Sequence, residues 1–137
     1  MAGSIQPFPL VRSGDRDHPV RTLQYLLRAS GRSMTVDGSF GPATDSAVRS
    51  YQSAHGLTVD GVVGNNTWYS ILPVLREGST GEAVKGLQRE LVDAGYSLTV
   101  DGSFGPATTS AVRSYQSKVG LVVDGVVGNN TWGSLVD

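Results

Sequence analysis

Residues 36–68 read VDGSFGPATDSAVRSYQSAHGLTVDGVVGNNTW, and residues 100–132 read VDGSFGPATTSAVRSYQSKVGLVVDGVVGNNTW. The two stretches lie 64 positions apart. The match extends outward without a gap, and 40 of the 64 residues in 9–72 are identical to their counterparts in 73–136. Similarity at a fixed period marks a duplicated structural unit. The chain is therefore two copies of one unit of about 64 residues.

Identity between the two copies is uneven. Positions 36–70 match at 30 of 35 sites, whereas positions 15–35 match at only 7 of 21. Tyr25 and Leu26 of the first copy correspond to Arg89 and Glu90 of the second. If Leu26 is exposed on its own unit, that face is a candidate contact with the other unit or with a partner.

Three helices are predicted in each unit. Val20, Leu23 and Leu27 have the 3- and 4-residue spacing of one helix face, which predicts a helix over residues 19–30. A second helix is expected from Pro42 to the stop at Gly56, because proline suits a first helical turn. A third, short helix is expected to begin at the Asn pairs, which make good N-caps; these pairs are Asn65–Asn66 and Asn129–Asn130.

Asp-Gly-x-x-Gly loops are predicted to separate these helices. They occupy Asp37–Gly41 and Asp60–Gly64, and again Asp101–Gly105 and Asp124–Gly128. An Asp side chain bonds the backbone N–H two residues on, and Gly accepts a positive φ, so the pattern is turn chemistry. The apolar residue before each second glycine should point inward. Residues 35–36 and 58–59 could pair in a brief ladder. The fold class is mainly α: two copies of a small three-helix fold with Asp-Gly loops.

Composition excludes several classes of protein. The 137 residues include 18 glycines, no cysteine, 12 acidic and 11 basic residues. No disulfide, thiolate nucleophile or cysteine metal site can exist, and a near-neutral chain lacks the basic footprint of a nucleic-acid partner. No apolar run approaches the roughly 20 residues that span a bilayer, so no membrane partner is expected. Residues 1–9 lack signal-peptide features and are interpreted as a lead-in or as residues left over from expression.

Five motif blocks occur in the same order in both copies. In the first copy they are LQ at 23–24 with Leu27, DGSFGPAT at 37–44, AVRSYQ at 47–52, GL at 56–57 and DGVVGNNTW at 60–68. This order resembles the peptidoglycan-binding domain of bacterial cell-wall hydrolases, and the resemblance covers residues 10–137. It implies a three-helix fold, domains at 10–72 and 73–137, and a non-catalytic role. It also implies a location outside the cell or in the wall, beside a hydrolase domain that this chain does not contain.

Catalysis finds little support in the residues. The two histidines, His18 and His55, correspond to Glu82 and Val119 in the second copy, so neither belongs to the repeated pattern. No nucleophile or metalloprotease motif is present. The Asp-Gly loops lack the ligand spacing of a calcium loop. We therefore expect no enzyme activity, no metal and no cofactor.

A glycan strand with peptide stems would need aromatic faces for sugars, and amides or cations for the stems. The repeated candidates predict a shallow groove in each unit, lined by the first Asp-Gly loop, the exposed side of the second helix and the Asn pair. For the tyrosines and tryptophans, a core position is the favoured interpretation, and for Arg49 a solvated charge. The candidate ligand-binding residues are Asp37, Phe40, Arg49, Tyr51, Asn65, Asn66 and Trp68, with Asp101, Phe104, Arg113, Tyr115, Asn129, Asn130 and Trp132.

Two alternatives to a wall anchor stay open. The same groove could hold a partner protein, or the units could be a structural spacer. As a wall anchor, the chain is expected to be a monomer whose two weak sites gain avidity on the order of 10²–10⁴ when both engage one polymer.

Overall fold

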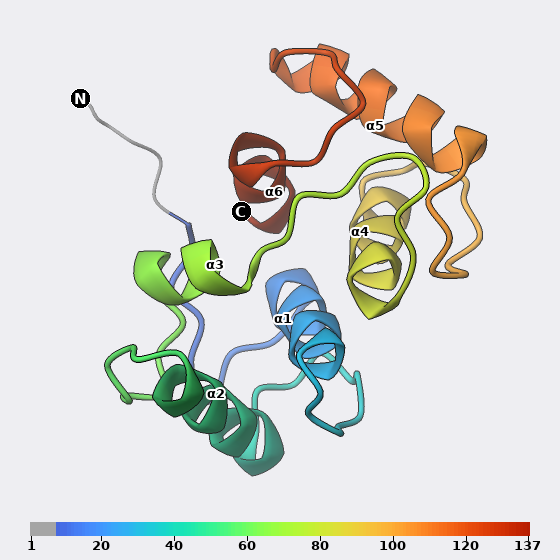
Figure 1. Ribbon diagram of the computed structural model, residues 1–137. Helices are drawn as coiled ribbons and strands as arrows, with labels where there is room; N and C mark the ends of the chain where they lie inside the picture. Colours follow the sequence, from blue (N-terminus) through green and yellow to red (C-terminus); the bar gives the residue numbers. More distant parts are fainter. Residues whose placement is uncertain (1–7) are drawn as a thin grey trace.

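The computed structural model describes residues 8–137, which form six helices (Figure 1). The first repeat contains α1, α2 and α3, and the second contains α4, α5 and α6. Short connections join them, and within residues 8–137 the extended pairing is limited to single β-bridges. The helices are α1 (His18–Ala29), α2 (Pro42–Ala54), α3 (Asn65–Ile71), α4 (Glu82–Asp93), α5 (Pro106–Val119) and α6 (Asn129–Val136).

The predicted helices are confirmed, and so are their stops. Gly31 and Gly56 follow α1 and α2 with φ of 98° and 68°, the left-handed conformation that glycine adopts without strain. The Asn pairs, however, are not N-caps. The caps of α3 and α6 are Gly64 and Gly128, in extended conformation and without a side-chain bond, so each Asn pair occupies the first helical turn instead.

The segment that precedes α1 holds both loops of the first repeat. Val11 and Val63 exchange backbone bonds of 3.1 and 2.8 Å, and Arg16 pairs with Ser39. The same bridges recur in the second repeat between Leu75 and Val127 and between Thr80 and Ser103. The expected ladder between residues 35–36 and 58–59 is not among the bridges of residues 8–137, which in the first repeat join the segment before α1 to Ser39 and Val63 instead.

Each repeat has its own aromatic core. Trp68 and Trp132 are fully buried, and their indole N–H groups donate to the carbonyls of Pro9 and Pro73 at 2.8 Å. The inward apolar residues of the loops, predicted from the sequence, are buried: Phe40, Val63, Phe104 and Val127. Phe8 is also buried, stacked 6.0 Å from Trp68, so residues 8 and 9 of the lead-in contact the first repeat.

The two repeats pack through α1 and α4, which lie side by side at the centre of the molecule (Figure 1). The pairing is antiparallel, because Arg21 meets Asp93 while Arg28 meets Glu82. Tyr25 lies over Gly86, where an added Cβ would be 3.2 Å from the Tyr25 Cβ. The prediction that the divergent α1 face contacts the second unit is thus confirmed. Part of the low identity of positions 15–35 falls on this contact, where Tyr25 and Leu26 correspond to Arg89 and Glu90.

Within residues 8–137, every helix is too short or too polar to cross a bilayer.

Candidate functional site

Each Asp-Gly loop is held by one buried glutamine. In the first loop the Gln24 amide donates to Asp37 Oδ1 at 3.0 Å and to Thr44 Oγ1 at 3.1 Å. Its carbonyl oxygen accepts the backbone N–H groups of Asp37 and Gly38 at 3.1 and 2.9 Å. Such a network fixes the loop because every buried polar group in it finds a partner. The same network surrounds Gln52, Gln88 and Gln116.

The loop aspartates have a structural role in these networks. Asp37 Oδ1 accepts the N–H of Ser39 at 3.0 Å, closing the turn predicted from the sequence. The hydrogen bond from Gln24 and that from Ser39 lower the pKa of Asp37 below its usual 3.8, because they stabilise the charged carboxylate. The pKa of Asp101 is lowered by its bonds from Ser103 and Gln88, and that of Asp124 by its bond from Val126.

The aromatic candidates lie in the core rather than on a surface. Trp68 and Trp132 are fully buried, Phe40 and Phe104 are 2% exposed, and Tyr51 and Tyr115 are 3% and 8% exposed. Their ring faces are therefore not presented to a ligand. This agrees with the core position favoured from the sequence. The hydroxyl groups of Tyr51 and Tyr115 are bonded to Ser70 and Ser134, at 2.7 and 2.5 Å.

A groove of about 450 Å³ lies beside the second Asp-Gly loop of the first repeat. The Asn pair, Asn65 and Asn66, lines it together with Asp60 of that loop. The groove predicted from the sequence included the first loop, but Asp37–Gly41 is bonded to α1 through Gln24 and does not line this groove. The Asn pair instead meets the loop that directly precedes it. We call this site the loop groove, formed by Leu10, Leu57, Asp60, Val62, Asn65 and Asn66.

The walls of the loop groove combine apolar surface with amide groups. Leu10 is 64% exposed and contributes aliphatic surface to a groove that the exposed Asn66 also lines. Asn65 accepts the backbone N–H of Phe8 at 2.8 Å, which fixes its oxygen and leaves its amide nitrogen to solvent or ligand. Since Gln52 immobilises the loop behind these groups, the groove is a preformed site of the kind that small ligands use.

Arg49 stands beside the loop groove rather than in it. Its guanidinium lies 3.1 Å from Asp45 Oδ2 and donates to the carbonyl of Asp60 at 3.3 Å. These bonds support the second loop from outside. In the second repeat Thr109 replaces Asp45, and Arg113 lies against Gly125 of the matching loop.

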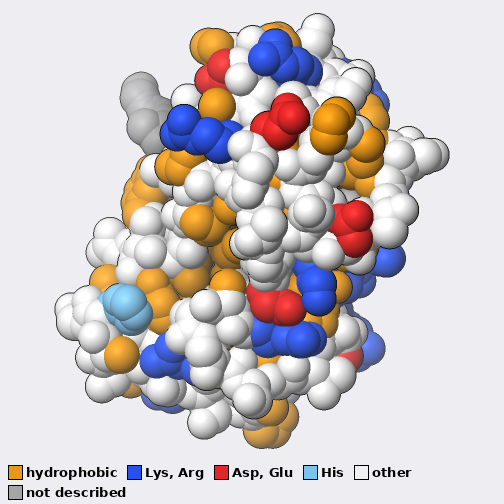
Figure 2. Space-filling model, turned by 45° about the vertical axis from the view of Figure 1, so that its right-hand side comes forward, with side chains coloured by type: hydrophobic (Ala, Val, Ile, Leu, Met, Phe, Trp, Pro, Cys, Tyr) orange, Lys and Arg blue, Asp and Glu red, His pale blue; other side chains and the backbone are white. Residues whose placement is uncertain are grey.

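The second repeat presents the same elements with a more apolar wall. Asn129 and Asn130 are exposed, like Asn65 and Asn66. Val74 and Val122 stand at the positions of Leu10 and Thr58, and they are 59% and 78% exposed. The face of the molecule shown in Figure 2 carries charges of both signs, interspersed.

The two histidines have structural contacts. His18 Nδ1 lies 2.9 Å from Glu90 Oε1 in the contact between the repeats, and the His55 ring stacks on Tyr51 at 4.0 Å. Among the residues that the structure describes, no group of three or more carboxylate or histidine side chains is arranged to hold a metal ion.

Sequence reasoning missed the apolar walls of the loop groove. Leu10 lies outside the motif blocks, and Leu57 follows a helix stop where an apolar residue is ordinarily core. The one signal was repetition: Leu57 recurs as Leu121, and the exposed apolar character of Leu10 recurs in Val74.

Comparison with known proteins gives one family and several relatives. The model of the family described as "Putative peptidoglycan binding domain" matches residues 16–71 and 80–135. N-acetylmuramoyl-L-alanine amidase CwlM of Mycobacterium tuberculosis is 34% identical over 91% of this chain and 37% of its own. Zinc D-Ala-D-Ala carboxypeptidase of Streptomyces albus G is 34% identical over 88% of this chain and 45% of its own. The SleB N-terminal domain structure is 44% identical, with a TM-score of 0.46, over 47% of this chain and 90% of that one. The chain thus spans less than half the length of both enzymes.

Proposed function

The chain belongs to the peptidoglycan-binding domain family, with two tandem copies of the domain, and from that premise we propose that it is a non-catalytic module that holds an attached hydrolase on the bacterial cell wall. The proposed ligand is peptidoglycan, and the proposed place of action is outside the cell. The hydrolase would be a separate domain, since the two matched regions account for most of this chain.

The loop groove is the observation that supports this proposal. Aliphatic side chains such as Leu10 suit the C–H faces of sugars and the methyl groups of alanine. The amides of Asn65 and Asn66 suit the acetamido and peptide groups that alternate with them. Because a glutamine-held loop stands behind the groove in each repeat, ordering the site costs little on binding. The exposed Asn pair and the glutamine-held loop occur in both repeats, so a polymer could engage both.

Sedimentation with purified, insoluble sacculi tests the proposal on the whole 137-residue protein. We expect the protein to pellet with sacculi at low salt and to pellet less with chitin or cellulose. The double variant Asn66→Ala, Asn130→Ala should bind more weakly, because it removes one groove amide from each repeat. A protein that stays in the supernatant at low salt contradicts the proposed function.

A matched control distinguishes the loss of a groove contact from a general effect of substitution on the fold. The pair Ser53→Ala, Ser117→Ala changes exposed α2 and α5 positions outside the loop groove and should pellet like the unmodified protein. Single substitutions then test avidity: if two sites act together, Asn66→Ala and Asn130→Ala each weaken binding and the double variant weakens it by more than either.

The second repeat favours one alternative, a protein-interaction module. Val122 exposes an apolar side chain there at the position of Thr58, and exposed apolar surface is typical of protein contacts. If the second repeat binds a protein, the variant Val122→Ser should bind sacculi as well as the unmodified protein does. If the second repeat binds the wall, the same variant should bind sacculi more weakly.

A further inference from the structure

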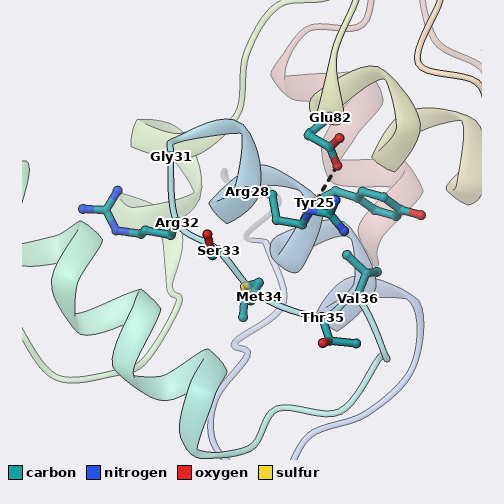
Figure 3. Close-up of a pocket in the computed structure, with 9 residues that line it drawn as sticks. All are labelled: Tyr25, Arg28, Gly31, Arg32, Ser33, Met34, Thr35, Val36 and Glu82. Carbon is teal, nitrogen blue, oxygen red and sulfur yellow. Dashed lines mark ion pairs between the residues drawn. The ribbon is translucent and has the colours of Figure 1, made fainter.

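A second groove lies between the repeats, at the C-terminal end of α1 (Figure 3). Its volume is about 770 Å³, larger than that of the loop groove. Tyr25, Arg28 and residues 31–36 line it from the first repeat, and Glu82 lines it from the start of α4. We call it the inter-repeat groove. Because Glu82 belongs to the second repeat, the groove exists only where the two repeats meet.

One wall of the inter-repeat groove is an extended segment with an open backbone. Along residues 31–37, exposed positions alternate with partly buried ones, the period of an extended strand. None of the hydrogen bonds described for residues 8–137 uses the backbone of Ser33, Met34, Thr35 or Val36. An extended edge of this kind offers N–H and C=O groups to another extended chain, as in strand addition.

Arg28 and Glu82 line the inter-repeat groove together with this segment, and Lys85 pairs with Glu82 from outside the lining residues. Arg28 Nε lies 3.2 Å from Glu82 Oε1, and Lys85 Nζ lies 3.2 Å from Glu82 Oε2. Glu82 is thus shared by two cations, so this cluster keeps one positive charge in excess. Arg28 stands in the middle of the groove, while Arg32 points away from it (Figure 3) and donates to Ser30 and Ser50. The excess charge favours a ligand with a carboxylate.

The second repeat does not reproduce this combination. The positions of Tyr25 and Arg28 are taken there by Arg89 and Val92. The aromatic ring and the central arginine are therefore confined to one side of the molecule, although the extended segments are similar in sequence. A ligand that needs all three features would bind once per chain, whereas the exposed Asn pair and the glutamine-held loop recur in each repeat.

We propose that the inter-repeat groove binds a short, extended peptide with a carboxylate, which adds as a strand along residues 33–36 and places the carboxylate at Arg28. The identity of the occupant rests on the proposed function: it is the peptide stem of peptidoglycan. Stems are short and carry amide groups and carboxylates, which match the open backbone and the arginine. The Tyr25 ring supplies apolar surface beside the chain.

Amide chemical-shift mapping on the full protein tests this proposal with two soluble probes, a synthetic stem tetrapeptide and a glycan oligomer stripped of peptide. The tetrapeptide should shift the signals of Arg28, residues 33–36 and Glu82. The stripped glycan should leave them in place. Thr35→Glu sets a like charge beside the ligand and should weaken the peptide by about fivefold. Thr99→Glu is the matched control in the second repeat and should bind the peptide normally.

The possible results distinguish a failure of the inter-repeat site from a failure of the proposed function. Peptide-induced shifts confined to the loop groove, or equal losses in Thr35→Glu and Thr99→Glu, overturn the inter-repeat site while leaving wall binding intact. Sacculus pelleting together with shifts from the stripped glycan alone does the same. If the protein does not pellet with sacculi and neither probe shifts any signal, the proposed function fails as well.

Discussion

His18 in the first repeat and Glu90 in the second lie 2.9 Å apart at the centre of the molecule, although 72 positions separate them in the chain. Glu90 is only 3% exposed, and it also accepts the hydroxyl proton of Thr22. Burial raises the pKa of Glu90 above its usual 4.5, against the lowering effects of Thr22 and His18. A carboxylate thus stands in the repeat contact at a place where the first repeat has Leu26.

Glu90→Gln should flatten the pH dependence of stability. Because the folded pKa is raised, the native state binds a proton more tightly than the unfolded chain, and Glu90 costs stability above its raised pKa. That cost is relieved as the pH falls toward 4.5. Glutamine cannot titrate, so urea unfolding of the variant should vary less between pH 4.5 and neutrality. Glu77→Gln, at an exposed site, is the control, and an unchanged slope in Glu90→Gln contradicts the prediction.

Asp101→Asn should act in the opposite sense and at lower pH. Hydrogen bonds from Ser103 and Gln88 hold the pKa of Asp101 below 3.8, so its stabilising effect is present above that value. The effect is lost as the pH falls through the lowered folded pKa. Asparagine keeps the turn-closing oxygen but has no charge to lose. Thermal unfolding between about pH 2 and 5 should therefore show a shallower acid decline, and an unaltered decline would count against a stabilising role for the carboxylate.

Gln88→Leu should be among the most damaging single substitutions. It leaves the N–H groups of Asp101 and Gly102 and the hydroxyl of Thr108 without their buried partner. Stranded buried groups cost about 1–3 kcal/mol each, so we expect a loss of at least about 3 kcal/mol in the free energy of unfolding. Urea titration measures it, with exposed Ser114→Ala as the control. A loss near that of Ser114→Ala would show that the loop does not depend on the clamp.

Phe8→Ala should destabilise a helix in each of the two repeats. The Phe8 ring lies 5.2 Å from the Tyr69 ring, and it occupies the space beside Gly133 of α6, where a Cβ would approach its Cε1 to 3.3 Å. Removing a buried phenylalanine costs about 3 kcal/mol. Hydrogen exchange should rise in α3 and α6 alike. A rise confined to α3 would mean that Phe8 serves only the first repeat.

The repeat motifs allowed much of the fold to be predicted from the sequence. Prolines at helix starts, glycines at helix ends and the Asp-Gly turns act locally, so helix positions and loop roles such as that of Asp37 were readable. Asn65 shows the limit: an asparagine at a helix start is a good cap in isolation, but the extended Gly64 took that place. The groove predicted from the sequence set the first loop beside the Asn pair, whereas the loop groove sets there the loop that directly precedes the pair.

The candidate site was harder to predict because exposure is a property of the whole molecule. Leu26 and Leu10 are both leucines, yet Leu26 is 1% exposed in the contact between repeats and Leu10 is 64% exposed at a groove. Neither pattern nor composition distinguishes them. The inter-repeat groove was beyond prediction, since Tyr25 and Glu82 meet only through the antiparallel pairing of α1 and α4.

The antiparallel pairing of α1 with α4 also explains what duplication made possible. A surface that meets an identical copy must be complementary to itself, so a charge near the axis faces its own kind. Once the partner is joined covalently, each face needs only to fit the other. Here His18, Arg21 and Arg28 are on one side and Glu82, Glu90 and Asp93 on the other. Because the copies are joined in one chain, neither helix face needs to be complementary to itself. The two faces instead recognise each other through opposite charges.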